Sequence, residues 1–426
     1  MTSSNGWIQA TLGAYFRVKH GYAFKGEFFA DSGQYILLTP GNFQAKGGLQ
    51  ERGEREKFYR GEFPADFLLR AGDLLVVMTD LTQDAPILGS PAIIQTADRF
   101  LHNQRLGKIV NLDESKMSKL FLYHLLNLPD VRSQIKGSAT GATVRHTAPD
   151  RIYAVKVRVP PLAIQERIAS ILSAYDELIE NNTRRIKILE EMAQMLYREW
   201  FVNFRFPGHR KVKMMESELG SIPEGWRVRN LFDVAHVSYG FPFKSKLFTV
   251  GGEGVPVIRI RDILSDASNT FTTESVDSKY IVKNGDLLVG MDGDFHMGKW
   301  AGGHAYLNQR VVRFRANGDL SPYFLFLALK APINHFDSTI VGTTVAHLSD
   351  RDLRSISVLV PSDDILKRSS AILDPLFGLE IALKLKNTNL RTTRDLLLPK
   401  LISGEISVDA AGRCAAGGIT LVDQHG

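Results

Sequence analysis

The side chains best able to do chemistry in this sequence are a few histidines and aspartates set among glycines. Asp292-Gly-Asp294 with His296 has the oxygen-rich character of a weak cation-binding loop. His146 and His347 end the similar stretches Gly-Ala-Thr-Val-Arg-His and Gly-Thr-Thr-Val-Ala-His, with no adjacent acid or cysteine to complete a triad. We interpret both histidines as turn or backbone-binding residues and predict no bound metal.

Familiar catalytic motifs are missing from the sequence. There is no phosphate-binding Gly-x-x-x-x-Gly-Lys-Ser/Thr loop, no His-Glu-x-x-His, no Gly-x-Ser-x-Gly and no Gly-x-Gly-x-x-Gly after a strand. The Asn/Asp-Pro-Pro-aromatic tetrapeptide of amino-methyltransferases is absent too. We therefore predict that the chain has no catalytic residues and no cofactor of its own. An enzyme with a novel site at Asp292, Asp294 and His296 remains a minor alternative.

Composition is that of an ordinary globular protein with a mild excess of positive charge. At 426 residues, with 44% hydrophobic and 23% charged residues, the chain is long enough for about three domains. Lys and Arg number 52 against 46 Asp and Glu, a balance that permits nucleic-acid binding without requiring it. The single cysteine, Cys414, excludes an internal disulfide. With no apolar membrane segment or signal peptide visible, we expect a cytoplasmic protein.

The sequence repeats itself in the same order along its length. His20-Gly-Tyr-Ala-Phe-Lys25 matches Tyr239-Gly-Phe-Pro-Phe-Lys244, and Asn103-Gln-Arg105 matches Asn308-Gln-Arg310. The separation of matching residues falls from 219 at Gly21 and Gly240 to 201 at His146 and His347. Such a drift indicates different loop lengths in two copies of one design. The matching pairs Gly72/Gly285 and Gly141/Gly342 are expected to serve backbone geometry.

Each copy is expected to be an α/β block followed by one long helix, which gives an α+β fold. Short apolar runs with turn residues predict strands at 35–38, 74–78, 92–94, 108–110 and 152–159, and at 255–260, 287–289 and 311–314. Ser118 caps a helix at 118–128, and Ser321-Pro322 starts its counterpart. Asp374-Pro375 is expected to interrupt the second long helix, and Pro399 to weaken its last turn.

A seam with alternating spacings of four and three predicts that the two long helices pair antiparallel as a coiled coil and hold the blocks at a fixed spacing. Asn182 is a polar seam position that could fix the register. The seam residues are Ile164, Ile168, Ile171, Tyr175, Leu178, Asn182, Leu189 and Leu196 in the first helix and Ile372, Leu376, Leu379, Leu383 and Leu390 in the second.

Several stretches resemble the specificity subunit of type I restriction-modification systems. The most specific run is Glu177-Leu-Ile-Glu-Asn-Asn-Thr183 through Leu196-Tyr-Arg-Glu-Trp-Phe-Val-Asn-Phe204, followed by Ser217-Glu-Leu-Gly-Ser-Ile-Pro-Glu-Gly-Trp226. The helix entry Pro160-Pro-Leu-Ala-Ile-Gln-Glu-Arg-Ile168 and the chain end Leu398-Pro-Lys-Leu-Ile-Ser-Gly-Glu-Ile406 are also similar. The resemblance covers about residues 7–407. Pro361-Ser-Asp-Asp-Ile365 departs from the pattern.

The resemblance implies a division into two target-recognition domains, at 1–161 and 205–361, and two spacer helices, at 162–204 and 362–407. Residues 408–426 are expected to form a disordered tail. It implies that each domain reads half of a split double-stranded DNA target. It also implies two modification (methyltransferase) subunits that carry S-adenosylmethionine and restriction subunits that use ATP with Mg. A two-domain DNA adaptor outside restriction-modification is the alternative.

If the two half-sites differ, residues identical in both copies cannot encode the difference. Lys25/Lys244, Arg105/Arg310 and His146/His347 are therefore candidates for phosphate contacts or for fold. Base readout is expected in the divergent loops 44–63, 79–101, 263–280 and 291–307. The candidate readers are Gln44, Lys46, Arg52, Arg55 and Gln83 in the first copy and Asp292, His296, Lys299 and Trp300 in the second.

Overall fold

The computed structural model describes residues 6–340 and 346–409 and divides into two compact units. Unit 1 contains the residues up to Glu177 and those from Arg391 onward, and unit 2 contains Leu178–Leu390. The chain therefore leaves unit 1, builds the whole of unit 2 and returns. Within the described ranges, no helix is both long and apolar enough to cross a membrane.

Unit 1 is built on a four-stranded sheet with the order β2-β10-β6-β8 and a second sheet with the order β3-β5-β4-β9. Leu74, Leu75, Val76 and Val77 of β6 are all buried, because both faces of this strand are covered. The strands of the two sheets are β2 Arg17–His20, β10 Leu106–Val110, β6 Leu74–Val77, β8 Pro91–Ile93, β3 Phe29–Ala30, β5 Phe58–Tyr59, β4 Tyr35–Leu38 and β9 Phe100–His102. Beside them lie β1 Ile8–Thr11 paired with β12 Lys156–Val159, β7 Thr79–Asp80 paired with β11 Arg145–His146, and the helices α1 Lys119–Leu126, α2 Pro129–Gly137 and α3 Pro149–Tyr153.

Unit 2 repeats this plan, which confirms the predicted duplication. Its four-stranded sheet has the order β16-β24-β21-β22, and a larger sheet has the order β17-β19-β18-β23-β20. The strands are β16 Ala235–Tyr239, β24 Val311–Ala316, β21 Leu287–Gly290, β22 Met297–Lys299, β17 Phe248–Thr249, β19 Phe271–Thr272, β18 Val255–Ile258, β23 Ala305–Leu307 and β20 Ile281–Val282. The rest of the unit comprises β15 Arg227–Asn230 paired with β25 Ser357–Val360, the hairpin β13 Met214–Ser217 and β14 Gly220–Pro223, and the helices α5 Leu231–Val234, α6 Pro322–Thr339 and α7 Asp350–Arg354.

Within the two α/β blocks most predicted strands and helix caps are present, and one predicted strand is wrong in part. Ser118 caps α1 through Phe121 N–H, and Ser321 caps α6 with Pro322 at its first position, as predicted. The predicted strand 152–159 is wrong in its first half, because α3 runs to Tyr153 and β12 begins only at Lys156. Proline is favourable at the first position of a helix, so Pro149 promotes a short helix here and not a strand.

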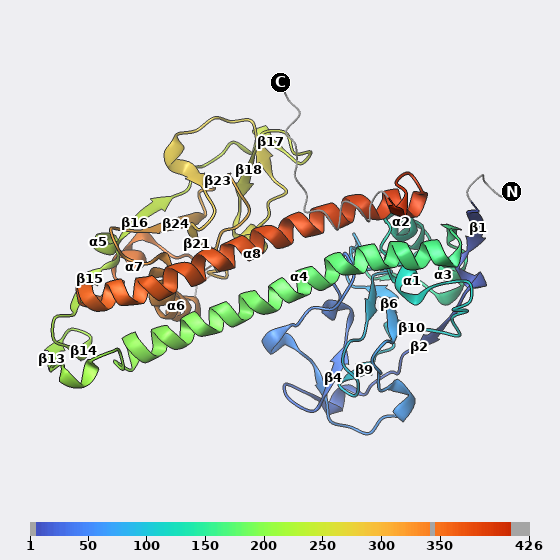
Figure 1. The fold of residues 1–426 in the computed structure, drawn as a ribbon, viewed down its shortest axis with the longest axis horizontal. Helices are drawn as coiled ribbons and strands as arrows, with labels where there is room; N and C mark the ends of the chain where they lie inside the picture. Colours follow the sequence, from blue (N-terminus) through green and yellow to red (C-terminus); the bar gives the residue numbers. More distant parts are fainter. Residues whose placement is uncertain (1–5, 341–345, 410–426) are drawn as a thin grey trace. The chain divides into compact units, whose positions relative to one another are not determined.

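The two long helices are α4 Leu162–Tyr197, which continues as a π-helical turn Arg198–Val202, and α8 Asp363–Ser403. The predicted interruption at Pro375 is wrong, because α8 runs through it, and the helix also continues past Pro399 to Ser403. Within each unit the two helices lie side by side and antiparallel (Figure 1). Asn182 Nδ2 donates to Asn387 Oδ1 at 2.9 Å in unit 2, and Arg394 pairs with Asp176 in unit 1.

The buried seam of these helices differs from the prediction at three positions. Ile168, Tyr175, Asn182 and Leu189 are buried as predicted. Leu178, however, is 45% exposed, and Ile372 and Leu379 are each 41% exposed. Their buried or half-buried counterparts are the next residues along, Ile179, Leu373 and Glu380. α4 also has apolar residues on its exposed face, so hydrophobicity alone does not show which of two adjacent residues is buried in the seam.

The chain end beyond α8 remains packed as far as it is described. Val408 packs against the core of unit 1, and Arg167 pairs with Asp409. The predicted disordered tail is therefore wrong for these two residues, and its remainder, 410–426, lies outside the described ranges.

Candidate nucleic-acid interface

The repeated motifs meet at one end of the four-stranded sheet in each unit. In unit 1, Tyr22 N–H donates to His102 O at 2.9 Å and Gln104 N–H donates to Tyr22 O at 3.0 Å. In unit 2, Phe241 makes the same two bonds with Leu307 O and Gln309 N–H, at 2.9 and 3.0 Å. The Gly-aromatic motif therefore lies against the Asn-Gln-Arg motif in both units. This brings Lys25 and Arg105, and likewise Lys244 and Arg310, to the same region of each unit.

Glycine is required where these two motifs touch. A Cβ placed on Gly21 would lie 2.0 Å from Asn103 O, and one on Gly240 would lie 1.8 Å from Asn308 O. No side chain fits at such distances, so the two motifs can approach only through glycine. Gly72 and Gly285 adopt φ of +84° and +88°, as their predicted backbone role requires, whereas Gly342 lies outside the described residues.

The shared histidines lie beside the ends of the central strands. In unit 1, β7 and β11 pair His146 with Thr79, and His146 Nδ1 is 3.0 Å from Thr79 Oγ1. In unit 2, His347 Nδ1 is 2.6 Å from Asp292 Oδ1, and Arg310 Nε is 3.2 Å from Asp292 Oδ2. We refer to these groups as the histidine corners, formed by Thr79 with His146 and by Asp292 with His347 and Arg310.

An open cavity of about 690 Å³ borders the Gly-aromatic motif of unit 1. Tyr22, Phe28 and Tyr59 line it together with the cations Lys25 and Arg60. Rings and cations in one concave surface are the groups that stack on bases and contact phosphates. Lys25 is exposed and makes only a long, exposed ion pair with Glu27, and Arg105 and the side chain of Lys244 in unit 2 are exposed as well.

The divergent-loop candidates of unit 1 lie at the surface, but several are engaged. Gln44 Nε2 donates to Leu49 O of its own loop at 2.9 Å. Lys46 Nζ lies 2.5 Å from Asp395 Oδ2, and this ion pair attaches the loop to α8. Arg52 is half-buried; its side-chain Nη1 donates to Thr39 Oγ1 at 3.4 Å, and its backbone N–H donates to Glu56 Oε1 at 2.7 Å. Arg55 and Gln83 are exposed and make no side-chain hydrogen bond with any described residue.

Two candidates of unit 2 are wrong as base readers. Lys299 and Trp300 are buried, at 3% and 1% exposure, and Trp300 Nε1 donates to Gly303 O at 2.7 Å. Asp292 is held by Arg310 and His347, and half-buried His296 lies 3.9 Å from Asp294. Among the described residues, no group of three or more His, Cys, Asp or Glu side chains is placed to hold a metal ion.

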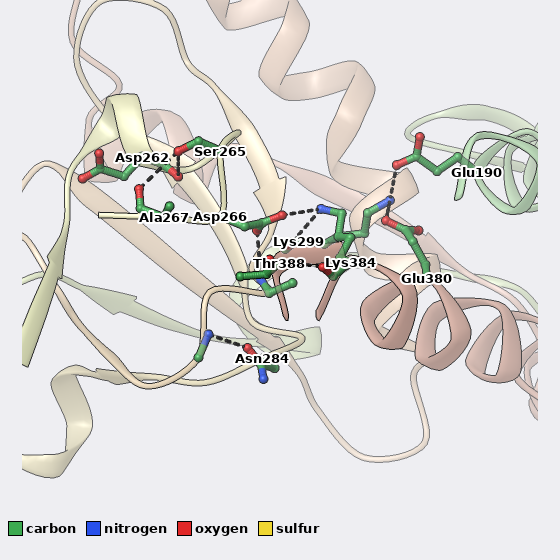
Figure 2. Close-up of polar contacts among 12 residues, drawn as sticks. Glu190, Asp262, Ser265, Asp266, Ala267, Asn284, Lys299, Glu380, Lys384 and Thr388 are labelled. Atoms are coloured by element: carbon green, nitrogen blue, oxygen red, sulfur yellow. Dashed lines mark hydrogen bonds and ion pairs between the residues drawn. The ribbon is translucent and has the colours of Figure 1, made fainter. Parts of the chain in front are cut away.

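Lys299, at the end of strand β22, instead connects the sheet of unit 2 to the two long helices (Figure 2). Its Nζ lies 2.8 Å from Glu380 Oε1 of α8 and 3.0 Å from Glu190 Oε1 of α4. Tyr323 Oη donates to Glu380 Oε2 at 2.7 Å, and burial raises the pKa of Glu380 against the opposing effect of Lys299. Nearby, Lys384 Nζ donates to Asp266 Oδ2 at 3.0 Å. The acidic residues of this network gave no sequence signal, since Glu is ordinary on a helix.

Two of the buried basic residues of unit 1, Arg132 and His102, were not singled out by the sequence. Arg132 donates to Leu88 O, Ala45 O and Pro86 O at 2.8–3.1 Å. Its guanidinium therefore holds backbone carbonyls of both divergent loops of unit 1, 44–63 and 79–101. Burial lowers the pKa of Arg132 to about 10. His102 is fully buried with its Nε2 2.9 Å from Leu106 O, and burial lowers its pKa to about 4. His102 therefore stays neutral and belongs to the fold.

Comparison with known proteins identifies the duplicated unit. The family model described as the type I restriction modification DNA specificity domain matches twice, at residues 5–191 and 223–390. The chain belongs to this family. It is 26% identical over 345 residues to the type I restriction enzyme MjaIX specificity subunit of Methanocaldococcus jannaschii, covering 77% of each chain.

Two further relatives agree with this family membership. The EcoBI specificity subunit of Escherichia coli is 36% identical over 142 residues, covering 33% of this chain and 30% of that one. The crystal structure of the S subunit from M. genitalium aligns with a TM-score of 0.57 at 18% identity, over 94% of this chain and 97% of that one. That likeness shows the fold, and the predicted two-domain architecture with paired long helices is confirmed.

Proposed function

We propose that this chain reads a split double-stranded DNA target for a type I restriction-modification complex, one half-site per unit. The observation that carries the proposal is the repeated backbone frame that presents a lysine, an arginine and a histidine in both units. Family membership supports it. Two similar surfaces on one chain suit two half-sites along a duplex. Shared cations contact phosphates, and the divergent loops read bases.

Catalysis in this proposal belongs to partner chains. Two modification subunits that bind S-adenosylmethionine would methylate adenine, and restriction subunits would use ATP with Mg, all in the cytoplasm. This chain would supply DNA recognition and docking surfaces. The absence of catalytic motifs from its sequence is consistent with that division.

The main test is co-expression with a type I modification (methyltransferase) subunit, followed by single-molecule sequencing of methylated adenine. A bipartite motif with a fixed gap is the expected result. A stable complex with this chain that methylates no defined motif would contradict the reading function. Sequence-specific DNA binding without any methyltransferase partner would favour the two-domain adaptor instead.

The gap between half-sites is proposed to depend on α4 and α8, since both helices pass from one unit into the other. One heptad inserted into each, after Glu177 and after Leu390, keeps the seam in phase. It lengthens the pair by about 10 Å at 1.5 Å per residue, or about three base-pair steps of 3.4 Å. Methylome sequencing should show the same two half-sites separated by about three more base pairs. An unchanged gap would contradict the spacer role.

A stripe of exposed apolar side chains on α4 is the proposed docking face for a modification subunit. Ile188, Met192 and Met195 are 54%, 45% and 59% exposed and recur at helical spacing. Exposed apolar groups grouped on one helix face are typical of a protein interface. Met192→Glu with Met195→Glu should abolish copurification of the modification subunit. The matched change Lys187→Glu, at an exposed position outside the stripe, should leave it intact.

A further inference from the structure

The two histidine corners share one backbone frame. Met78 N–H donates to Arg105 O at 2.9 Å, and Met291 N–H donates to Arg310 O at 2.9 Å. On the other side, Thr147 N–H donates to Met78 O at 2.9 Å, and Leu348 N–H donates to Met291 O at 2.8 Å. The residue after each methionine, Thr79 or Asp292, therefore occupies the same place in both units.

Within this frame the histidine is constant and its partner is not. The rings of His146 and His347 are both exposed, and each directs Nδ1 to the side chain at the variable position. That side chain is a buried threonine hydroxyl in unit 1 and a half-buried carboxylate in unit 2. In unit 2 the carboxylate also holds Arg310, whereas Arg105 makes no ion pair with any described residue.

The partner decides which atoms the exposed ring can offer. A carboxylate only accepts hydrogen bonds, so Asp292 places the hydrogen of a neutral His347 on Nδ1 and leaves Nε2 as an acceptor. A threonine hydroxyl can donate as well as accept, so Thr79 allows His146 to carry its hydrogen on Nε2. An acceptor suits the amino groups of cytosine and adenine, and a donor suits the N7 and O6 atoms of guanine.

We propose that position 79/292 is specificity-determining and acts by positioning: Thr79 and Asp292 set the hydrogen-bonding character with which the shared histidine meets a base edge in each half-site. The inference rests on the proposed DNA-reading function. It revises the expectation that residues identical in both units cannot distinguish the two half-sites. Two identical histidine rings with different hydrogen-bond partners can present a donor in one unit and an acceptor in the other.

The test replaces the partner and leaves the histidine in place. Asp292→Thr gives unit 2 the unit 1 partner, and Thr79→Val removes the hydroxyl from unit 1 with little change of shape. Each full-length variant is co-expressed with the modification subunit, and methylated adenines are sequenced. Asp233→Thr, which removes an exposed carboxylate paired with Arg229 in unit 2, is the matched control.

We expect Asp292→Thr to shift base preference at least ten-fold at one or more positions of one half-site and to leave the other unchanged. Thr79→Val should alter only the opposite half-site. Lower methylation at an unchanged motif would overturn the inference while leaving the reading function intact. Failure of the unaltered chain to direct methylation to a split motif would instead overturn the reading function itself. If Asp292→Thr is insoluble, Asp292→Asn decides by the same criteria, since its amide can donate to Nδ1.

Discussion

Replacing Lys299 by methionine is expected to destabilise unit 2 severely. Lys299 and Glu380 are 2.8 Å apart with side-chain exposures of 4% and 0%, so the change leaves a carboxylate buried without its cation. Removing one partner of a buried ion pair costs about 3–5 kcal/mol. At about 2–4 °C per kcal/mol for a unit of this size, the midpoint of thermal unfolding should fall by about 6–20 °C.

The pH dependence of this variant has a definite sign. Burial already raises the pKa of Glu380, and loss of Lys299 removes a group that lowers it. A raised pKa in the folded state means that stability is greatest below the pKa of the unfolded chain and is lost as pH rises through the folded pKa. Lys299→Met should therefore lose less stability at pH 5 than at pH 8.

The companion variants separate charge from packing. Lys299→Met with Glu380→Gln should recover most of the loss, because the glutamine still accepts the hydrogen bond of Tyr323 and carries no charge. Arg368→Met, which breaks an exposed pair with Asp364, should change stability by no more than about 0.5 kcal/mol. Urea unfolding followed by hydrogen exchange in α6 reports on unit 2. A loss below about 1 kcal/mol in the single variant, or no recovery in the double variant, would refute the reasoning.

Three further outcomes follow from contacts described above. Gly240→Ala should weaken DNA binding at least ten-fold in an electrophoretic shift assay, because its Cβ would lie 1.8 Å from the carbonyl of the neighbouring motif. Asn182→Leu should cost about 1–3 kcal/mol by leaving the buried Asn387 Oδ1 without its donor, and the double leucine variant should recover the loss in urea unfolding. Arg132→Met should impair methylation at one half-site only, because it releases three loop carbonyls of unit 1.

For each of these three predictions, one outcome would contradict the physical reasoning behind it. Gly251→Ala, where an added Cβ meets nothing within 4 Å, should bind DNA normally, and equal loss in both glycine variants would contradict the close-approach argument. A double leucine variant less stable than Asn182→Leu would show that the asparagine pair stabilises the helices. Equal impairment of both half-sites by Arg132→Met would show that its effect is not confined to the loops of unit 1.

The duplication and the fold were predictable because they rest on patterns that survive divergence. Gly21 and Gly240 are retained where a backbone carbonyl approaches within 2.0 and 1.8 Å of the Cβ position, and such constraints leave short, ordered matches in the sequence. Helix caps at Ser118 and Ser321 were predictable for a similar reason, since capping is local chemistry.

The site was less predictable because loop divergence has two causes. Lys299 lies in a divergent loop because it pairs there with Glu190 and Glu380 of the long helices, and Trp300 because it fills a core of unit 2. In the sequence, a cation that forms a buried ion pair cannot be told from one that contacts DNA. The helix seam failed for a related reason. Glu380 and Asn387 are buried polar residues, whereas Leu178 is an exposed apolar one. Only the three-dimensional partners distinguish these cases.

The return of the chain from unit 2 to unit 1 has a consequence for biosynthesis. Every residue of unit 2 lies between Leu178 and Leu390, so a ribosome releases all of unit 2 before the segment that completes unit 1. Leu398, Leu401 and Ile402 enter the core of unit 1, and Arg394 pairs with its Asp176. Unit 1, most of which is translated first, therefore keeps part of its core uncovered until the residues after Leu390 have been synthesised. A nascent chain stalled before residue 391 should hold a folded second domain and an unfinished first one, which is the reverse of the usual order of co-translational folding.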